Sequence, residues 1–452
     1  MRFNSIFLMA VAFTVLWATA GVASAESLQE ALASAYSSNP TLRAERARQR
    51  GTDELVPQAL SGWRPTVTAQ ASFGVQRTDN NVTRSTTTTP GSVTISLSQP
   101  IFRGFRTVSE TGQAESNVQA GRQNLLAVEE DILFQGVQAY MNVLRDRQVV
   151  ALRKRNVSAL QQELNAANER FKVGEITRTD VAQSRARVAQ AQGAVASAQA
   201  TLDASVANYI KVVGHSPGTL HYPPLAKLPR SLEKAQAEAQ DINPNILAAA
   251  FVQDAATFTI ALIRGELLPE ISLNASATVT SNPQKGIDRA DSQRLEGVLT
   301  VPIYEAGRTY SRVRQSKQVA SQRSLEVIQA VRAVREAVSN AWHFLQAAQA
   351  AITSNKAQVS ASQLALEGVR QEYLVGSRTT LDVLNAQTDV VNARISLVLA
   401  ERDRIVASYQ VLASVGKLTA RKLGLHVEYY DVEENYLRVR NKWIGTAVET
   451  VE

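Results

Sequence analysis

The chain has 452 residues and a formal net charge of +7 at pH 7, and it contains no cysteine. The lack of cysteine excludes disulfides, thiolate metal sites and a cysteine-linked lipid anchor. The basic residues are interspersed with acidic ones and do not cluster with aromatic residues. This pattern is typical of a solvated surface, so we expect no nucleic-acid partner.

Residues 1–25 have the pattern of a secretory signal peptide. Arg2 supplies the positive charge, residues 6–17 form an apolar core, and Ala23-Ser24-Ala25 is a small-residue cleavage site. The alternative is an N-terminal anchor helix, although this apolar core is too short to span a bilayer. Further along we expect no run close to the roughly 18 apolar residues that a membrane helix needs. The sequence therefore predicts an exported chain without a helical membrane span.

The remainder of the chain contains an internal duplication. Several anchors recur in the same order about 200 residues later: Ser27-Leu28, Asn39-Pro40 and Pro65 return as Ser231-Leu232, Asn243-Pro244 and Pro269. We divide the chain into repeat 1 (26–214), a proline-rich linker (215–230), repeat 2 (231–416) and a C-terminal tail (417–452). The tail either wraps the middle of the molecule together with the linker or is partly unstructured, and the sequence leaves both possibilities open.

Each repeat is predicted to hold short helices, two strands and one long helical hairpin, in that order. The strands of repeat 1 cover about 65–76 and 92–100, and its hairpin covers 103–213. In repeat 2 the strands cover about 270–280 and 294–302, and the hairpin covers 304–415. Neither hairpin contains proline, and both are rich in Ala, Gln, Arg, Glu and Val, which favours helices.

The return helix of each hairpin carries apolar residues seven positions apart. The two series are Val181, Val188, Val195, Leu202 and Tyr209, and then Leu384, Val391, Val398, Ile405 and Leu412. Sustained heptads predict coiled-coil packing, and abundant alanine allows the helices to approach closely. The outgoing helix of repeat 1 would reach about 105 Å, which is too long for an ordinary globular core.

The predicted strands alternate between apolar and polar residues. In the first strand, Val67, Ala69, Ala71 and Phe73 alternate with Thr68, Gln70 and Ser72. Segments of about ten alternating residues joined by polar turns are typical of outer-membrane strands, although a half-buried soluble sheet has the same pattern. Four strands cannot close a barrel in lipid, so several chains would have to share one. Two chains would supply eight strands and three would supply twelve, and a pore favours three.

Three segments are more specific: Phe-Lys-Val-Gly-Glu-Ile-Thr-Arg-Thr-Asp-Val at 171–181, Tyr-Leu-Val-Gly-Ser-Arg-Thr-Thr-Leu-Asp-Val-Leu-Asn-Ala-Gln at 373–387, and Pro-Ile-Tyr-Glu-Ala-Gly-Arg at 302–308. They are similar to segments of the TolC-type outer-membrane channels of multidrug efflux and type I secretion, and the resemblance covers essentially the whole mature chain. It implies a mixed, mainly α fold: a homotrimer with a twelve-stranded outer-membrane β-barrel, four strands per chain, continued by a long α-helical coiled-coil tunnel in the periplasm.

The resemblance also implies a location and partners. The channel would sit in the outer membrane of a Gram-negative bacterium and dock to a periplasmic adaptor (membrane fusion) protein and an inner-membrane pump of the RND or ABC type. In that family the two hairpin turns, here Val173-Gly174 and Val375-Gly376, lie at the far periplasmic end, where the adaptor is met and the conduit closes. Gly174 and Gly376 also suit the positive φ that ends a helix.

Thr179, Asp180, Tyr373 and Arg378 stand close to these turns in the sequence. The resemblance implies that Asp180 pairs with Arg378 and Thr179 with Tyr373, which would tie neighbouring hairpins together in a closed gate. The alternative for Asp180 is a helix cap, because the residue follows a threonine by three positions, as Asp382 does. Exposed ion pairs are weak, so a docking partner could release such a latch.

Asp382 and Asn385 resemble the family's inner constriction, where acidic residues from three chains ring the axis. This chain departs from the family there, because position 385 is Asn rather than Asp. One carboxylate ring would remain. We therefore expect cation preference, with weaker block by divalent cations than a double ring would give.

We find no catalytic constellation, cofactor motif or metal site in the sequence. The four histidines share no metal-ligand spacing, and no glycine-rich phosphate loop surrounds Gly307-Arg308. The prediction is therefore a passive exit duct for drugs, toxic compounds or secreted proteins, and not an enzyme. The alternatives are a periplasmic coiled-coil adaptor or scaffold whose strands form a soluble domain and, more distantly, an exported enzyme.

Overall fold

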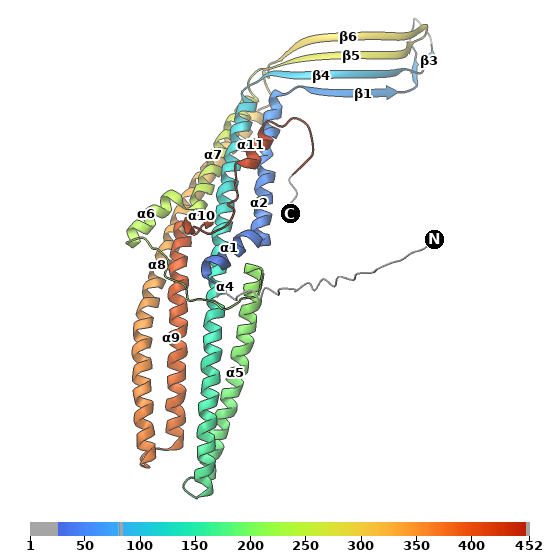
Figure 1. Cartoon of the computed structure of the whole chain (residues 1–452). Coiled ribbons are helices and arrows are strands. Elements are labelled where there is room, and N and C mark those ends of the chain that lie inside the picture. Colours follow the sequence, from blue (N-terminus) through green and yellow to red (C-terminus); the bar gives the residue numbers. More distant parts are fainter. Residues whose placement is uncertain (1–25, 80, 82–84, 449–452) are drawn as a thin grey trace, which may run out of the picture.

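The structure is a computed structural model that describes residues 26–79, 81 and 85–448, so the predicted signal peptide lies outside the described residues. Two long helical hairpins run side by side, and a four-stranded sheet extends from the end opposite their turns (Figure 1). Short helices surround the middle and upper parts of the hairpins. The chain is mainly helical, with the strands confined to one end.

The two repeats build matching sets of elements. Repeat 1 forms α1 (Leu28–Ser38), α2 (Pro40–Asp53), α3 (Leu55–Leu60), a 3-10 turn (Ser61–Trp63), β1 (Thr66–Phe73), β2 (Gln76–Thr78), β3 (Thr86–Thr88), β4 (Gly91–Arg103), α4 (Arg106–Lys172) and α5 (Arg178–Val213). Repeat 2 forms α6 (Leu232–Ile242), α7 (Pro244–Gly265), β5 (Glu270–Gln284), β6 (Ile287–Thr300), α8 (Arg308–Leu374) and α9 (Thr380–Val415). The outgoing helices have 67 residues each and the return helices 36 each, so the duplication extends to helix length.

An equivalent asparagine side chain bonds to the end of the return helix in each hairpin, at the end opposite the turn. Asn39 lies between α1 and α2, and its Nδ2 donates to the carbonyl of Val212 at the end of α5, at 3.0 Å. Asn243 lies between α6 and α7, and its Nδ2 donates to the carbonyl of Ser414 at the end of α9, at 2.9 Å. Because the last carbonyls of a helix have no partner within the helix, these amides satisfy them and fix the return helices in place.

Two strand boundaries differ from the prediction. β6 begins at Ile287 and not near 294, because its ladder with β5 continues through Arg289 and Asp291, where the apolar alternation is lost. The segment expected to be a polar loop after β1 contains the short pair β2–β3. Backbone hydrogen bonds extend β6 beyond the residues that show the period-2 pattern, and they join β2 and β3 into a separate two-stranded sheet.

The sheet order is β1-β4-β5-β6, all antiparallel, which leaves β1 and β6 as its edges. The register aligns apolar residues from all four strands on one face, for example Val67, Leu97, Ala275 and Leu295. The opposite face is polar, and its hydroxyl and amide groups bond across strands: the Thr94 and Thr278 hydroxyls lie 3.0 Å apart, and Ser98 donates to Asn274 at 2.8 Å. One chain therefore forms a two-faced sheet with open edges.

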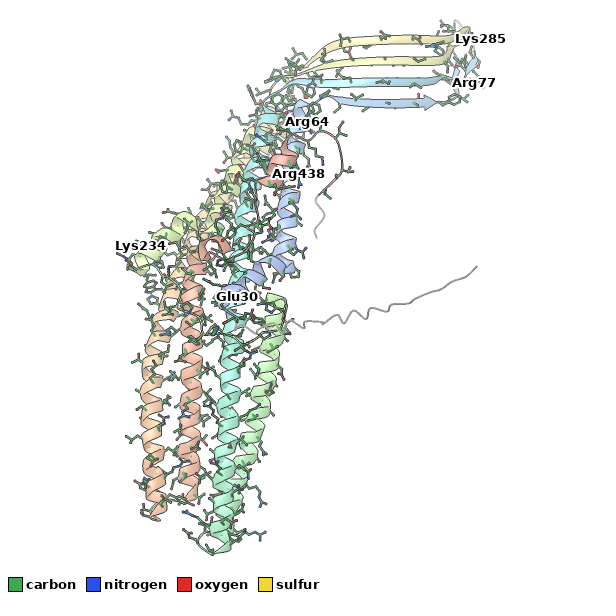
Figure 2. The ribbon with its side chains drawn as sticks, in the orientation of Figure 1. Glu30, Arg64, Arg77, Lys234, Lys285 and Arg438 are labelled. Carbon is green, nitrogen blue, oxygen red and sulfur yellow. The ribbon has the colours of Figure 1, made fainter. Side chains whose placement is uncertain are left out.

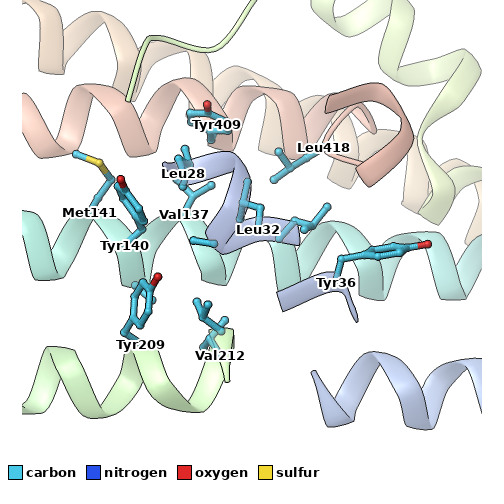
Figure 3. Close-up of a cluster of buried hydrophobic side chains, with 14 of the residues drawn as sticks. Leu28, Leu32, Tyr36, Val137, Tyr140, Met141, Tyr209, Val212, Tyr409 and Leu418 are labelled. Atoms are coloured by element: carbon cyan, nitrogen blue, oxygen red, sulfur yellow. The ribbon is translucent and has the colours of Figure 1, made fainter. Parts of the chain in front are cut away.

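The main core lies where α1 packs among α4, α5 and α9 (Figure 3). Tyr140 and Tyr209 are fully buried there. The Tyr140 hydroxyl donates to the backbone carbonyls of Glu26 and His221, at 2.8 and 2.7 Å, and the Tyr209 hydroxyl donates to the Glu26 carboxylate at 2.6 Å. Since buried hydroxyls need partners, these bonds fasten the start of repeat 1 and the linker to the hairpin.

The described part of the tail, 417–448, runs from the end of α9 along α4 and α2 toward the sheet, through α10 (Ala420–Leu423) and α11 (Glu434–Arg440) (Figure 1). Near the base of β1, Arg64 donates to the carbonyl of Lys442 at 2.8 Å and stacks on Trp443, and Figure 2 shows Arg64 above Arg438 of α11. The sequence left open whether the tail wraps the middle of the molecule or is partly unstructured. The described part of the tail wraps around the hairpins.

One expectation about membrane helices needs correction. The stretch Leu232–Gly265 is long and apolar enough to cross a membrane by length and composition, and 17% of its most apolar window is buried. It comprises two helices, α6 and α7, which meet at Asn243–Pro244, and α7 packs along α4 and α8. Polar residues such as Gln253 and Asp254 interrupt this stretch, so a search of the sequence for unbroken apolar runs does not find it.

Candidate functional site at the hairpin tips

The two hairpin turns share one backbone geometry. α4 and α8 end before Val173 and Val375, and the following glycines have positive φ, +76° at Gly174 and +79° at Gly376. A side chain at either glycine would meet open space, so the positive φ is the reason for glycine there. Both valines are highly exposed, at 78% and 81%, so each tip presents an apolar side chain to its surroundings.

Each return helix begins with a capping box. Asp180 accepts from the backbone N–H and the hydroxyl of Thr177, at 3.0 and 2.7 Å, and Asp382 accepts from Thr379 at 3.0 and 2.8 Å. The bonds from Thr379, backbone first, lower the pKa of Asp382, so this carboxylate is ionised at neutral pH. Within the single chain both aspartates therefore act as helix caps, the alternative that the spacing left open.

The predicted latch residues bond within their own hairpins in this single chain. Arg378 donates through Nε to Glu372 at 2.7 Å, and the Tyr373 hydroxyl lies 3.2 Å from that of Thr380. Thr179 lies exposed in the first turn of α5. The pairs Asp180–Arg378 and Thr179–Tyr373 would join neighbouring hairpins in an assembly, and they stay a prediction.

Three polar contacts join the two hairpins of one chain near the tips. The Arg170 guanidinium lies 4.8 Å from the centroid of the Tyr373 ring, Arg370 pairs with Glu163 at 3.3 Å, and Arg187 donates to Asn385 at 2.7 Å. All three are partly or fully exposed, so each contributes little on its own. In the contact at Asn385, the amide oxygen accepts a hydrogen bond from Arg187 of the neighbouring hairpin.

A buried apolar contact accompanies these polar ones. Leu384 of α9 is 1% exposed and belongs to a cluster of side chains from the first hairpin, namely Leu160, Leu164, Ala167, Val181, Val188 and Ala191. It lies in sequence between Asp382 and Asn385. The segment predicted to line the constriction is thus anchored in the adjacent hairpin through its neighbouring leucine.

Sequence reasoning missed Arg170, Arg187 and the Glu163–Arg370 pair as contact residues. Their partners lie about 200 residues away, so no local spacing signals them. The heptad series did identify Leu384 as a packing residue, but it could not tell which hairpin the side chain enters.

The site holds no arrangement suited to covalent chemistry. In the described part of the chain, no three His, Cys, Asp or Glu residues come together in a way that could hold a metal ion. What the tips offer instead is a set of weak polar contacts, a buried leucine and exposed valines at two rigid turns. Such an arrangement can hold helices together and release them.

The fold defines the class of protein. The structure superimposes on the Campylobacter jejuni CmeC outer membrane channel with a TM-score of 0.78, at 14% identity, covering 92% of this chain and 89% of that one. It also matches the open state of the Neisseria gonorrhoeae MtrE outer membrane channel with a TM-score of 0.73, at 19% identity, covering 86% and 88%. The fold is therefore that of outer-membrane channels.

The sequence defines the family. The profile of the outer membrane efflux protein family matches residues 31–215 and 236–417. The chain is 42% identical to outer membrane efflux protein BepC of Brucella suis biovar 1 (strain 1330), covering 94% of this chain and 93% of that protein. It is 26% identical to outer membrane protein TolC of Escherichia coli (strain K12), covering 88% and 84%. This chain belongs to the outer membrane efflux protein family.

Family membership confirms several predictions. The resemblance to TolC-type channels is correct, and so are the outer-membrane location and the role as an exit duct in efflux or secretion. Relatives at lower identity include the alkaline protease secretion protein AprF of Pseudomonas aeruginosa. The family consists of channel and transport proteins rather than enzymes.

Proposed function

We propose that three copies of this chain assemble into a passive duct, with a twelve-stranded barrel in the outer membrane and a helical tunnel in the periplasm. The two-faced sheet carries this proposal. Apolar side chains of one face are exposed, with Val67 at 65%, Ile95 at 54% and Leu295 at 72%, while the other face is polar. Lipid outside and water inside would match these faces, whereas a soluble periplasmic scaffold would leave the apolar face in water.

The open edges support sharing of the barrel between chains. β1 and β6 lie at opposite edges of an antiparallel sheet of four strands, so β6 of one chain and β1 of the next can pair antiparallel and continue the same pattern. Edges left unpaired in lipid would cost several kcal/mol for each unbonded group. Three chains close the sheet with twelve strands and leave a lumen.

The absence of cysteine from this chain permits a direct test by disulfide crosslinking. A cysteine at Thr68 of β1 is combined in turn with one at Ser292, Arg294 or Glu296 of β6. Within one chain these strands are three strand spacings apart, about 14 Å, whereas a disulfide needs Cα atoms within about 7 Å. Oxidised outer membranes should therefore contain covalent dimers and trimers.

Two controls accompany this experiment. Ser96 and Ser276 face each other across β4 and β5, so cysteines at both positions should form a disulfide within one chain and show that oxidation is complete. The Thr68→Cys variant alone should remain monomeric, since each β1 edge meets β6. If every β1–β6 combination stays monomeric while the Ser96–Ser276 disulfide forms, the shared barrel is refuted.

We infer that the hairpin tips meet a periplasmic adaptor protein, which connects the duct to an inner-membrane pump of the RND or ABC type. Val173-Gly174 and Val375-Gly376 support this, because apolar side chains stand exposed at turns whose positive φ the glycines allow. Val173→Asp with Val375→Asp should abolish export of a pump substrate from cells. The purified variant should keep its conductance, and loss of both would point to misfolding instead.

We further propose that Thr179, Asp180, Tyr373 and Arg378 form the closing latch between hairpins in the trimer, and that Asp382 forms a single carboxylate ring at the constriction. Thr179 and Arg378 are exposed in one chain, and Asp180, Tyr373 and Asp382 are partly exposed, which supports this proposal because a neighbouring chain could reach them. Arg378 and Glu372 would have to separate for Arg378 to reach Asp180, and exchange between exposed pairs of this kind costs little.

A further inference from the structure

A pocket of about 460 Å³ lies between the two repeats beside the main core, and its lining includes no residue of the hairpin tips or the sheet. Its walls come from α1, α2, α4, the junction of α6 with α7, and the tail. The volume falls within the range of small-molecule sites, about 300–1,000 Å³. No residue of the proposed gate or barrel lines it, so it is distinct from both of those sites.

The charge balance of this pocket favours an anion. Four cationic side chains line it: Arg46, Arg122, Arg421 and Lys422. Its two acids, Glu129 and Glu130, are already engaged, because they accept from the backbone N–H groups of Ala420 and Leu418 at 2.7 and 3.2 Å. Burial raises the pKa of both acids, and it raises that of Glu130 to about 8, so Glu130 carries little negative charge at neutral pH.

Arg122 is the most buried of the four cationic residues that line this pocket. The residue is only 8% exposed; its Nη1 lies 3.4 Å from Glu433, and its guanidinium lies 5.2 Å from the Tyr436 ring centroid. Its Nε is buried and has no hydrogen-bond partner among the described residues. Because this Nε has almost no accessible surface, an anion in the pocket would bond to the terminal Nη nitrogens of Arg122, whose ion-pair partner Glu433 lies 3.4 Å away with a side chain that is 64% exposed.

The remaining walls suit an apolar body. The Arg46 guanidinium lies between two tyrosine rings, 4.4 Å from that of Tyr36 and 5.3 Å from that of Tyr430. Four aliphatic residues also line the pocket: Leu125, Leu126, Ile242 and Val432. Aromatic rings held by a cation and flanked by aliphatic side chains offer both stacking and apolar contact.

We propose that this pocket binds a small organic anion, a carboxylate or sulfonate on an apolar or aromatic body, with the anionic group on Arg122 and the body against the tyrosines. Binding to this pocket does not depend on conduction, so a binding measurement tests the pocket separately from the proposed duct. Because the pocket is lined by both repeats and the tail, the ligand would contact each of them at once.

The test is equilibrium binding of 2-naphthoate to the full-length protein in lipid nanodiscs, measured by calorimetry. Uncharged 2-naphthalenemethanol is the ligand control. We expect one saturable site per chain that binds naphthoate with at least about tenfold higher affinity than the alcohol. A charge-assisted hydrogen bond contributes roughly that factor. Arg122→Met should weaken naphthoate binding by at least about tenfold and leave binding of the alcohol nearly unchanged.

Two further variants keep the test decisive. Arg421→Met removes a cation at the exposed rim of the pocket and should also weaken naphthoate binding. This variant provides the test if Arg122→Met does not fold. Arg155→Met, an exposed position on α4 outside the pocket, is the matched control and should bind as the wild type does. No saturable site at millimolar naphthoate, equal affinity for the alcohol, or equal affinity in the pocket variants would each overturn the proposal.

Discussion

The buried contact of Leu384 should hold the closed gate more strongly than the polar latch does. Opening that separates the second hairpin from the first would bring Leu384, now 1% exposed, out of its cluster with Leu160, Leu164 and Val181. Leu384→Ala removes most of this contact and leaves a cavity, at a cost of about 2–5 kcal/mol per chain. The closed state should therefore lose at least about 30-fold in population relative to the open state.

Single-channel recording of the purified protein in planar bilayers measures this effect. Leu384→Ala should raise the fraction of time in the open state far more than Arg378→Ser, because the Arg378–Glu372 pair is exposed and screened by water. Leu364→Ala is the matched control, since Leu364 is 76% exposed on α8. If Leu384→Ala gates like the wild type, or if Arg378→Ser opens the channel more, the apolar contact does not hold the gate.

Three other predictions follow from the tips and the tail. Arg378→Ser should lengthen channel openings modestly, and unchanged open times would remove Arg378 from the latch. Asp382→Ala should lower the permeability ratio of potassium over chloride, obtained from reversal potentials, and an unchanged ratio would refute the carboxylate ring. The third concerns pH, because burial raises the pKa of Glu130 from the ordinary 4.5 to about 8 beside Glu129 and Lys422. Between about pH 5 and about pH 8 the folded chain keeps the proton on Glu130, whereas the unfolded chain loses it. The free energy of unfolding should therefore fall by up to a few kcal/mol as the pH rises over this range. Thermal unfolding of Glu130→Gln should show a shallower fall, and an identical fall would contradict the assignment.

Local periodicity explains how much of the fold the sequence could predict. The heptads of the return helices correspond to buried positions such as Val188 and Ile405, because helix packing repeats along the chain itself. The alternation in β1 and β4 likewise matches the two faces of the sheet. The start of β6 could not be found, since Arg289 and Asp291 pair with β5 through backbone groups that any residue can supply.

Contacts between distant segments explain what the sequence could not predict. Arg187 meets Asn385, and Glu129 meets Ala420, across separations that carry no spacing signal. The course of the tail depends on such contacts, because Glu129 and Glu130 each accept from its backbone. At the tips, the Val-Gly pairs and the spacing of Thr and Asp identified the turns and the capping residues, but the partners of Arg378 and Tyr373 depend on which hairpins stand next to each other.

The central claim is that this chain alone forms an aqueous duct through the outer membrane. The most direct measurement is the conductance of the purified wild-type protein in a planar lipid bilayer. The proposed assembly predicts a stable pore with cation preference, mostly closed and opening briefly. Purified trimers that insert into the bilayer and conduct no ions, at any voltage or in the Leu384→Ala variant, would contradict it.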